Sequence, residues 1–169
     1  MQSRLQVGEE TVIRNPPSVI RNRKRILFFS ALFRPYVGGA EVFVEEVAKR
    51  LAKHHGITIL TIRRSWKLPQ TEIFHGIRIV RVGFGMKFDK FLYPLLALFK
   101  SFSIEHDIVY GVLESYAGLA LAFYKLFTRR PAILNLQSGT LDDWWRGRGA
   151  NLVLRRLIHT MPDAIHAIS

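Results

Sequence analysis

The chain has no cysteine among its 169 residues, which excludes a disulfide framework and a thiolate metal site. It also lacks a long apolar run. The longest covers residues 91–99 and is interrupted by Pro94, far below the roughly 20 residues that span a bilayer. The first residues are polar, so we expect no signal peptide. These absences favour a reducing, cytoplasmic location.

Two nucleotide-binding fingerprints are missing as well. Neither G-x-G-x-x-G nor G-x-x-x-x-G-K-[ST] occurs in the sequence. The six histidines show no metal-ligand spacing and no H-E-x-x-H, so no metal is expected. No Ser-His-Asp arrangement can be argued from their positions either.

Acidic residues are scarce. Thirteen Asp and Glu face 25 Lys and Arg, which gives a net charge of +12. Such an excess indicates an anionic partner: nucleic acid, an acidic membrane surface or a phosphate-bearing substrate. Nucleic acid is the least favoured, because no recognised motif is present and the aromatics lie mostly in apolar runs. Residues 1–24 read as a basic, mobile leader, and residues 25–169 as one domain.

What is present is a regular alternation of short apolar runs with amphipathic or apolar helical segments. This pattern is typical of βαβ units and predicts an α/β fold, a three-layer, Rossmann-like, mostly parallel and doubly wound sheet. The second half of a hairpin around His75-Gly76 is expected at residues 77–82. Expected strands cover residues 26–29, 57–62, 72–74, 77–82, 108–111, 132–136 and 164–168. Expected helices begin near residue 40 and cover residues 91–102, 116–127 and 151–159.

The first helix has a clear pattern. Phe43, Val44, Val47 and Leu51 share one face, while a charged face holds Glu45, Glu46, Lys49, Arg50 and Lys53. Gly38 and Gly39 precede this helix. Free N–H groups and the helix dipole at such a position favour a phosphate, and glycine permits close approach and a positive φ. A plain turn between a strand and its crossover helix is an equal alternative on the glycines alone.

The run P-x-x-G-G-A-E, from Pro35 to Glu41, resembles the N-terminal domain of GT-B glycosyltransferases of the family 4 type. The resemblance continues through D-I-V-Y-G at 107–111, P-A-I-L-N-L-Q-S-G at 131–139 and P-D-A-I-H-A-I-S at 162–169. It therefore spans roughly residues 25–169. It implies the acceptor-side half of an enzyme that moves a sugar from a nucleotide-diphosphate donor to a glycan or lipid hydroxyl. Family 4 transfer retains configuration and usually needs no metal or other cofactor.

The resemblance also assigns residues. Gly38 and Gly39 would bind the donor diphosphate, and the acceptor and sugar side would be lined by Arg34, Tyr36, Glu114, Gln137 and Ser138. Gln137 and Tyr110 stand where family members often have histidine, which leaves no general base to assign. The family's donor domain and its E-x(7)-E region are not in this sequence. We therefore expect the chain to be inactive alone and to need that domain in cis or in trans, as a fragment, a truncated frame or a split subunit.

Structural alternatives apply to each of these side chains. Arg34 could be a solvated surface arginine, and Glu114 or Ser115 could cap the following helix. The cluster Asp142, Asp143, Trp144, Trp145 could stack on a sugar ring, or form a hydrophobic lid under a long loop.

The segment 87–102 offers a further possibility. It is apolar, with Lys87, Lys90 and Lys100 near its ends, as in helices that lie in a membrane interface. An ordinary helix packed on the sheet is the favoured alternative. A non-catalytic membrane-docking or scaffold domain, peripheral on the inner membrane face, is thus the second functional hypothesis.

Overall fold

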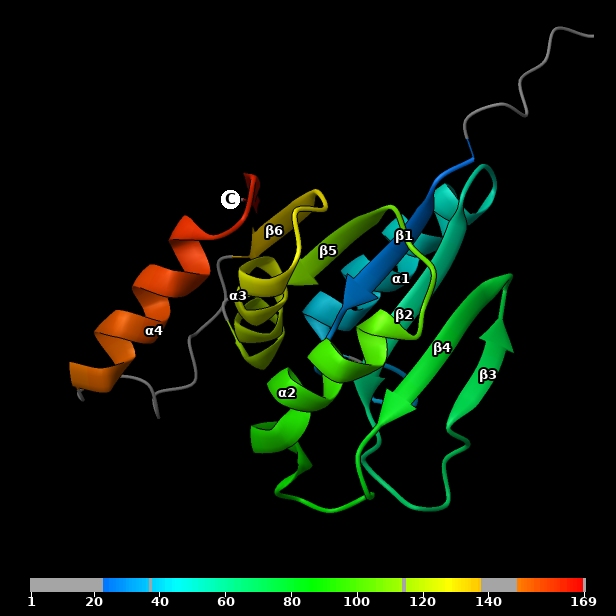
Figure 1. Cartoon of the computed structure of the whole chain (residues 1–169). Coiled ribbons are helices and arrows are strands. Elements are labelled where there is room, and N and C mark those ends of the chain that lie inside the picture. The colour runs from blue at the N-terminus through cyan, green and yellow to red at the C-terminus, as the bar shows by residue number, and fades with distance from the viewer. Residues whose placement is uncertain (1–22, 37, 114, 138–148, 169) are drawn as a thin grey trace, which may run out of the picture.

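The computed structural model describes residues 23–36, 38–113, 115–137 and 149–168. Seven strands form a single sheet in the order β3-β4-β2-β1-β5-β6-β7, in which β3 pairs antiparallel with β4 and all other pairs are parallel (Figure 1). The strands are β1 (Arg25–Phe29), β2 (Gly56–Ile62), β3 (Thr71–Phe74), β4 (Ile77–Val82), β5 (Ile108–Val112), β6 (Ala132–Gln137) and β7 (Ala164–Ile168). The helices are α1 (Gly39–Ala52), α2 (Asp89–Phe102), α3 (Tyr116–Phe127) and α4 (Gly149–Thr160).

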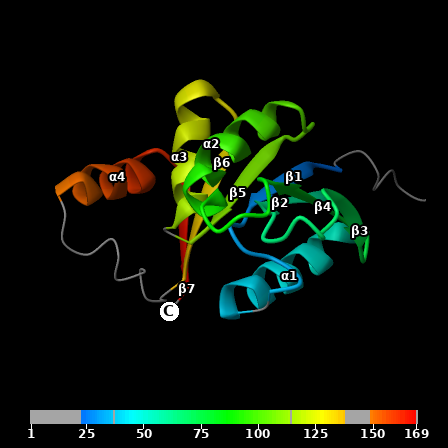
Figure 2. The same ribbon diagram turned by 90° about the horizontal axis from the view of Figure 1, so that it is seen from below.

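Helices cover both faces of this sheet, α1 on one side and α2 and α3 on the other (Figure 2). The arrangement follows from the sequence, because successive residues of a strand point to opposite faces. In β1, Phe28 points toward α1, whereas Leu27 and Phe29 point toward α2 and α3. The short apolar runs are therefore strands buried on both faces, as the sequence predicts, and the fold is the expected three-layer, Rossmann-like one.

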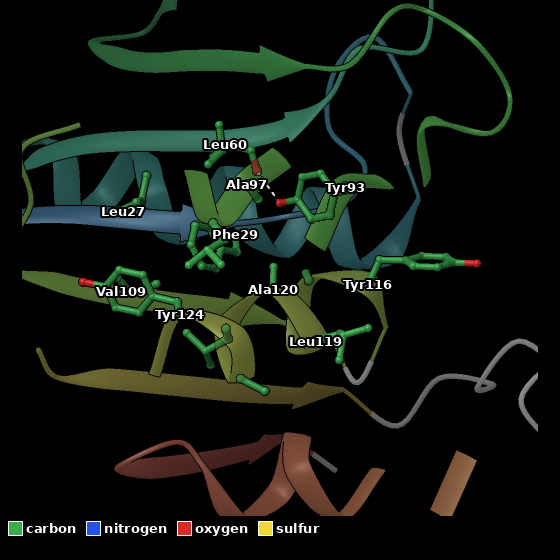
Figure 3. Packing of buried hydrophobic residues seen from close by; sticks show 14 of the residues in the cluster. Leu27, Phe29, Leu60, Tyr93, Ala97, Val109, Tyr116, Leu119, Ala120 and Tyr124 are labelled. Atoms are coloured by element: carbon green, nitrogen blue, oxygen red, sulfur yellow. Dashed lines mark hydrogen bonds between the residues drawn. The ribbon is translucent and has the colours of Figure 1, made fainter. Parts of the chain in front are cut away.

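The larger core lies beneath α2 and α3. Figure 3 shows side chains of β1, β2 and β5 packed against residues of these two helices. Tyr93 of α2 is fully buried there, and its hydroxyl donates a hydrogen bond of 2.7 Å to the Leu60 carbonyl. Because the hydroxyl has this hydrogen-bond partner, burying the ring leaves no polar group unpaired, and Tyr93 holds α2 on the sheet.

The reversal of winding occurs at β1. The connection from β1 to β2 runs through α1 on one face, and the connection from β4 to β5 runs through α2 on the other. The helices that follow the neighbouring strands β1 and β5, α1 and α3, therefore lie on opposite faces of the sheet. Open α/β sheets have their binding crevice at the carboxyl ends of the strands at such a switch point.

Most expected elements are confirmed, with ends shifted by no more than two residues. The hairpin turn is present: His75 and Gly76 have φ of 48° and 77°, as the two central residues of a type I′ turn require. One expectation is wrong. Glu45 is buried and does not belong to the exposed charged face of α1, because it turns inward to meet Arg34.

Candidate functional site

The site is built by two loops at the switch point. One follows β1 and leads to Gly38, and the other follows β5 and leads to Ser115. Because Phe29 pairs with Gly111, the two strands end side by side and their loops open at the same edge of the sheet. Leu113 has a φ of 71°, and its N–H donates to the Asn135 carbonyl at 2.9 Å. The second loop is thus held to β6 by a main-chain hydrogen bond.

The two glycines at the start of α1 have different surroundings. Gly38 is the N-cap, in extended conformation with φ of −124°, and Gly39 is the first helical residue. Neither glycine uses a positive φ, and within the described residues the left-handed glycines are Gly76, Gly83 and Gly85. A Cβ at Gly39 would meet nothing within 4 Å. Space, rather than backbone conformation, is what glycine provides at position 39.

At Gly38 the space is occupied by Glu41. A Cβ on Gly38 would lie 2.6 Å from the Glu41 Oε2, so a side chain at position 38 would displace this carboxylate from its present place. Glu41 stands in the first turn of α1, where the helix dipole stabilises a negative charge. The carboxylate thus occupies part of the region in which a bound anion would profit from the same N–H groups.

Arg34 lies in the loop between β1 and α1. Its Nε and Nη2 donate to the two carboxylate oxygens of Glu45 at 2.6 and 2.8 Å, and its guanidinium lies over the Phe74 ring, 4.4 Å from the centroid. Lys49 also pairs with Glu45, at 2.6 Å. Arg34 and Lys49 lower the pKa of Glu45 to about 2, with the Arg34 hydrogen bonds as the largest cause, and the Glu45 carboxylate in turn raises the pKa of Arg34. Arg34 therefore fastens its loop to α1 and β3.

A second arginine, Arg81, is hydrogen-bonded to the main chain of the same loop. Arg81 of β4 is buried, and its Nη2 donates to the Arg34 carbonyl at 3.0 Å and to Glu72 Oε1 at 2.7 Å. Its Nη1 donates to the Pro69 carbonyl at 3.2 Å. Because a planar guanidinium can hydrogen-bond several groups at once, a buried arginine with several acceptors holds them in a fixed arrangement.

Polar side chains also meet in the middle of β5, β6 and β7. Asn135 is fully buried, and its Nδ2 lies 3.1 Å from the His166 Nδ1, which is 3.5 Å from the Tyr110 hydroxyl. Burial raises the pKa of Tyr110, so its hydroxyl stays protonated near neutral pH. Asn135 Oδ1 has no partner within the described part of the chain. The cluster can donate and accept hydrogen bonds on the side of the sheet that carries α1.

The sequence model of Glycosyltransferase Family 4 matches residues 37–169. The chain belongs to this glycosyltransferase family. No curated protein matches it significantly. Among solved structures, it is similar to sucrose-phosphate synthase from Thermosynechococcus elongatus, with a TM-score of 0.68 and 13% identity over 85% of this chain and 42% of the other. A second structure of that enzyme gives a TM-score of 0.62 and 12% identity, over 86% of this chain and 77% of the other.

These likenesses show the fold, a GT-B-type domain of family 4. The chain spans 42% of the length of the first of these structures. β7, the expected last strand, forms one edge of the seven-stranded sheet.

Within this family 4 domain, the predicted site residues fall into three groups. Gly38, Gly39, Arg34 and Tyr36 all lie in or beside the loop that follows β1. Tyr36 is exposed, and the Arg64 guanidinium lies over its ring at 5.2 Å. Gln137 is the last residue of β6 and pairs with Ile168. Glu114, Ser138 and the cluster at 142–145 lie outside the described residues.

Sequence reasoning missed three features of this region. Nothing in the sequence shows that the Glu41 carboxylate lies over Gly38. The amphipathic pattern of α1 places Glu45 toward solvent, whereas it pairs with Arg34. Asn135 could have been noticed, because an amide inside the apolar run A-I-L-N-L-Q must find a hydrogen-bonding partner within the core.

In the part of the chain that the structure describes, no helix combines the length and hydropathy needed to cross a membrane. Nor do three His, Asp or Glu side chains gather there as metal ligands.

Proposed function

We propose that this family 4 domain is the acceptor-side half of a glycosyltransferase that moves a sugar from a nucleotide-diphosphate donor to a hydroxyl, with retention of configuration. The observation that carries the proposal is the free space at Gly39, at the amino end of α1, together with the parallel pairing of β1 and β5, whose carboxyl ends lie side by side. Membership of the family supports the reaction class.

In this proposal the main-chain N–H groups of Gly38 and Gly39 donate to the diphosphate. The helix dipole favours the anion, and the absence of a side chain at position 39 lets a phosphate approach the backbone. Glu41 opposes the same anion, because its carboxylate lies over Gly38. Binding of a diphosphate therefore requires that the Glu41 side chain turn outward.

The acceptor and sugar side would be formed by Tyr36, Glu114, Gln137 and Ser138. Arg34 contributes indirectly in this proposal, since its guanidinium is held by Glu45 and fixes the loop that carries Tyr36 and the glycines. No general base is assigned. A donor-binding domain, in cis or in trans, completes the enzyme, because a transferase must orient both substrates together.

The exposed apolar face of α2 favours a second, compatible role, which is peripheral association with an anionic membrane on its cytoplasmic side. A purely scaffolding domain would keep this association and lose nucleotide binding.

The test of the proposed function is a titration of the 169-residue chain with UDP and, separately, with inorganic pyrophosphate, followed through backbone amide resonances. We expect both ligands to shift the amides of Gly38 and Gly39 first, and chloride at matched ionic strength to leave them in place. Shifts confined to surface lysines, or absent altogether, would contradict the assignment of this loop to the diphosphate.

A further inference from the structure

The outer side of α2 carries a row of exposed apolar side chains. Phe91, Leu95, Phe99 and Phe102 lie within an arc of about 80° on a helix of 3.6 residues per turn. Each is roughly half exposed or more, and Phe99 reaches 66%. The opposite side of the helix packs on the sheet through the buried Tyr93 and Ala97, and Leu98, beside the row, is buried as well. The segment is therefore both the sheet-packing helix that we favoured and an apolar surface.

The loop before α2 extends this surface. Phe84 and Met86 are 61% and 53% exposed, and the loop that presents them is held by Asp89. The buried Asp89 Oδ2 accepts hydrogen bonds from the N–H groups of residues 84, 85 and 86 at 2.7–2.9 Å. A loop fixed by three hydrogen bonds to one buried carboxylate keeps its apolar tips in place without a core to bury them.

The exposed charged residues near the apolar row are all basic. Lys87, Lys90 and Lys100 are exposed, and the Lys90 Nζ lies over the Phe91 ring, 5.0 Å from its centroid. Asp89 is the sole acidic residue between positions 83 and 102, and it is 1% exposed. We call the combination of the exposed apolar residues between 84 and 102 and these three lysines the apolar–basic face.

We propose that the apolar–basic face docks on an anionic lipid bilayer, with its phenylalanines in the acyl-headgroup boundary and its lysines among the lipid phosphates. Exposed apolar side chains rimmed by lysines and free of exposed acids match the two requirements of peripheral membrane binding, apolar burial and attraction to anionic lipid. A second copy of the chain is a poorer occupant, since it would bring the same three positive charges against these three.

Docking in this way also orients the candidate site. Phe91, at the amino end of α2, contacts Tyr116, the first residue of α3, edge to face with ring centroids 5.8 Å apart. Because α3 begins at the loop after β5, the apolar–basic face runs up to the crevice. The mouth of the crevice then lies near the membrane plane. This binding does not depend on sugar transfer, so it can be tested whether or not the proposed function holds.

The first test removes charge alone. Vesicles of phosphatidylcholine with about one quarter phosphatidylglycerol are sedimented with the full chain at low salt, and pure phosphatidylcholine vesicles serve as the neutral reference. We expect Lys87→Gln/Lys90→Gln/Lys100→Gln to weaken binding at least about tenfold, since each lysine near the surface contributes severalfold. The matched control Arg23→Gln/Lys24→Gln/Lys53→Gln loses the same charge from exposed positions outside this face and should weaken it less than about threefold.

The second test removes apolar surface. Leu95→Ser/Phe99→Ser should reduce binding about tenfold while thermal melts stay near that of the parent, because both side chains are already exposed. Val42→Ser is its control: Val42 is 48% exposed, like Leu95, but stands on α1 across the sheet.

If the two triple variants of the first test weaken vesicle binding equally, only net charge matters and the proposal is overturned. Unchanged binding of Leu95→Ser/Phe99→Ser would overturn it too. If the serine variant does not fold, the lysine comparison decides alone. A tetramer or dimer that appears in the parent and is abolished by Leu95→Ser/Phe99→Ser, with no vesicle binding, would assign the face to self-association instead.

Discussion

The Arg34 guanidinium and the Glu45 carboxylate form a two-point hydrogen bond, Nε to Oε2 at 2.6 Å and Nη2 to Oε1 at 2.8 Å. Arg34 belongs to the loop after β1, and Glu45 lies in the second turn of α1, so the pair closes this loop onto the helix whose first turn carries Gly38 and Gly39. The geometry of the candidate diphosphate site thus depends on a contact that touches no ligand.

We expect Arg34→Met to lower the free energy of unfolding at neutral pH by about 1 kcal/mol, after allowance for the partial exposure of Arg34. The folded pKa of Glu45, about 2, lies below its ordinary 4.5. The stabilisation is therefore fully present above about pH 4.5 and disappears as the pH falls toward 2. The difference between parent and variant in denaturant titrations should shrink over this window.

Arg50→Met is the control for that comparison, because Arg50 pairs with Glu46 on the exposed side of α1. It should change stability by no more than a few tenths of a kcal/mol at any of these pH values. A difference between Arg34→Met and the parent that stays constant down to pH 2 would mean that packing on Phe74, not the ion pair, is what Arg34 contributes.

Gly39→Val should weaken pyrophosphate binding about tenfold, which corresponds to about 1.4 kcal/mol, and leave the thermal melt almost unchanged. A Cβ there meets nothing within the protein and no positive φ is needed, so the valine would obstruct only a ligand. Calorimetric titration checks the affinity. Gly118→Ala is the opposite case, since its Cβ would lie 2.9 Å from the Leu113 carbonyl and should lower the melt. Unchanged affinity of Gly39→Val would reduce the glycine pair to a plain turn.

Glu41→Gln should shift affinity and stability in opposite directions. Removing the negative charge over Gly38 ends its repulsion of a diphosphate, and we expect pyrophosphate to bind severalfold tighter. The same change removes a favourable charge from the first turn of α1, which costs about 0.3–1 kcal/mol. Glu46→Gln, with the same charge change in a later turn, should leave the affinity as it is. Weaker binding by Glu41→Gln would show that the carboxylate organises the site instead of competing for it.

The sheet and its helices could be predicted because they depend on periodicity, which is local in sequence. Residues 26–29 and 108–111 are short apolar runs without interruption, which is typical of strands buried on both faces. The hydrogen-bond partners of polar side chains could not be predicted in this way. Whether Glu45 faces solvent or Arg34 depends on where a loop 11 residues earlier folds, and amphipathic pattern alone places a glutamate outward. The same holds for Asn135, whose neighbour His166 comes from another strand.

Asp89 and Gly83 offer a test of the loop before α2. Gly83 has a φ of 108°, and a Cβ there would lie 2.7 Å from the Asp89 Oδ2. We expect Gly83→Ala and Asp89→Ala each to lower the free energy of unfolding by about 1–3 kcal/mol, the first through strain and clash, the second through loss of three main-chain hydrogen bonds. Denaturant titration measures both. Because both remove the same arrangement, the double variant should cost clearly less than the sum of the two. Full additivity would mean that the two residues act separately.

The 169-residue chain alone should transfer no sugar at a measurable rate. The main-chain donors at Gly38 and Gly39 can hold at most the diphosphate, and burial keeps the Tyr110 hydroxyl protonated near neutral pH. Holding donor and acceptor in a fixed geometry provides many orders of magnitude of the rate in such reactions, and that requires a second wall to the crevice. The measurement is release of UDP or GDP from a panel of nucleotide sugars, with vesicles and soluble glycans as acceptors, using purified chain. Acceptor-dependent turnover that Gly39→Val abolishes would show that one domain suffices, and the two-domain requirement would then be wrong. Slow release that is unaffected by acceptor and by Gly39→Val is ordinary hydrolysis or a contaminant, and agrees with the expectation.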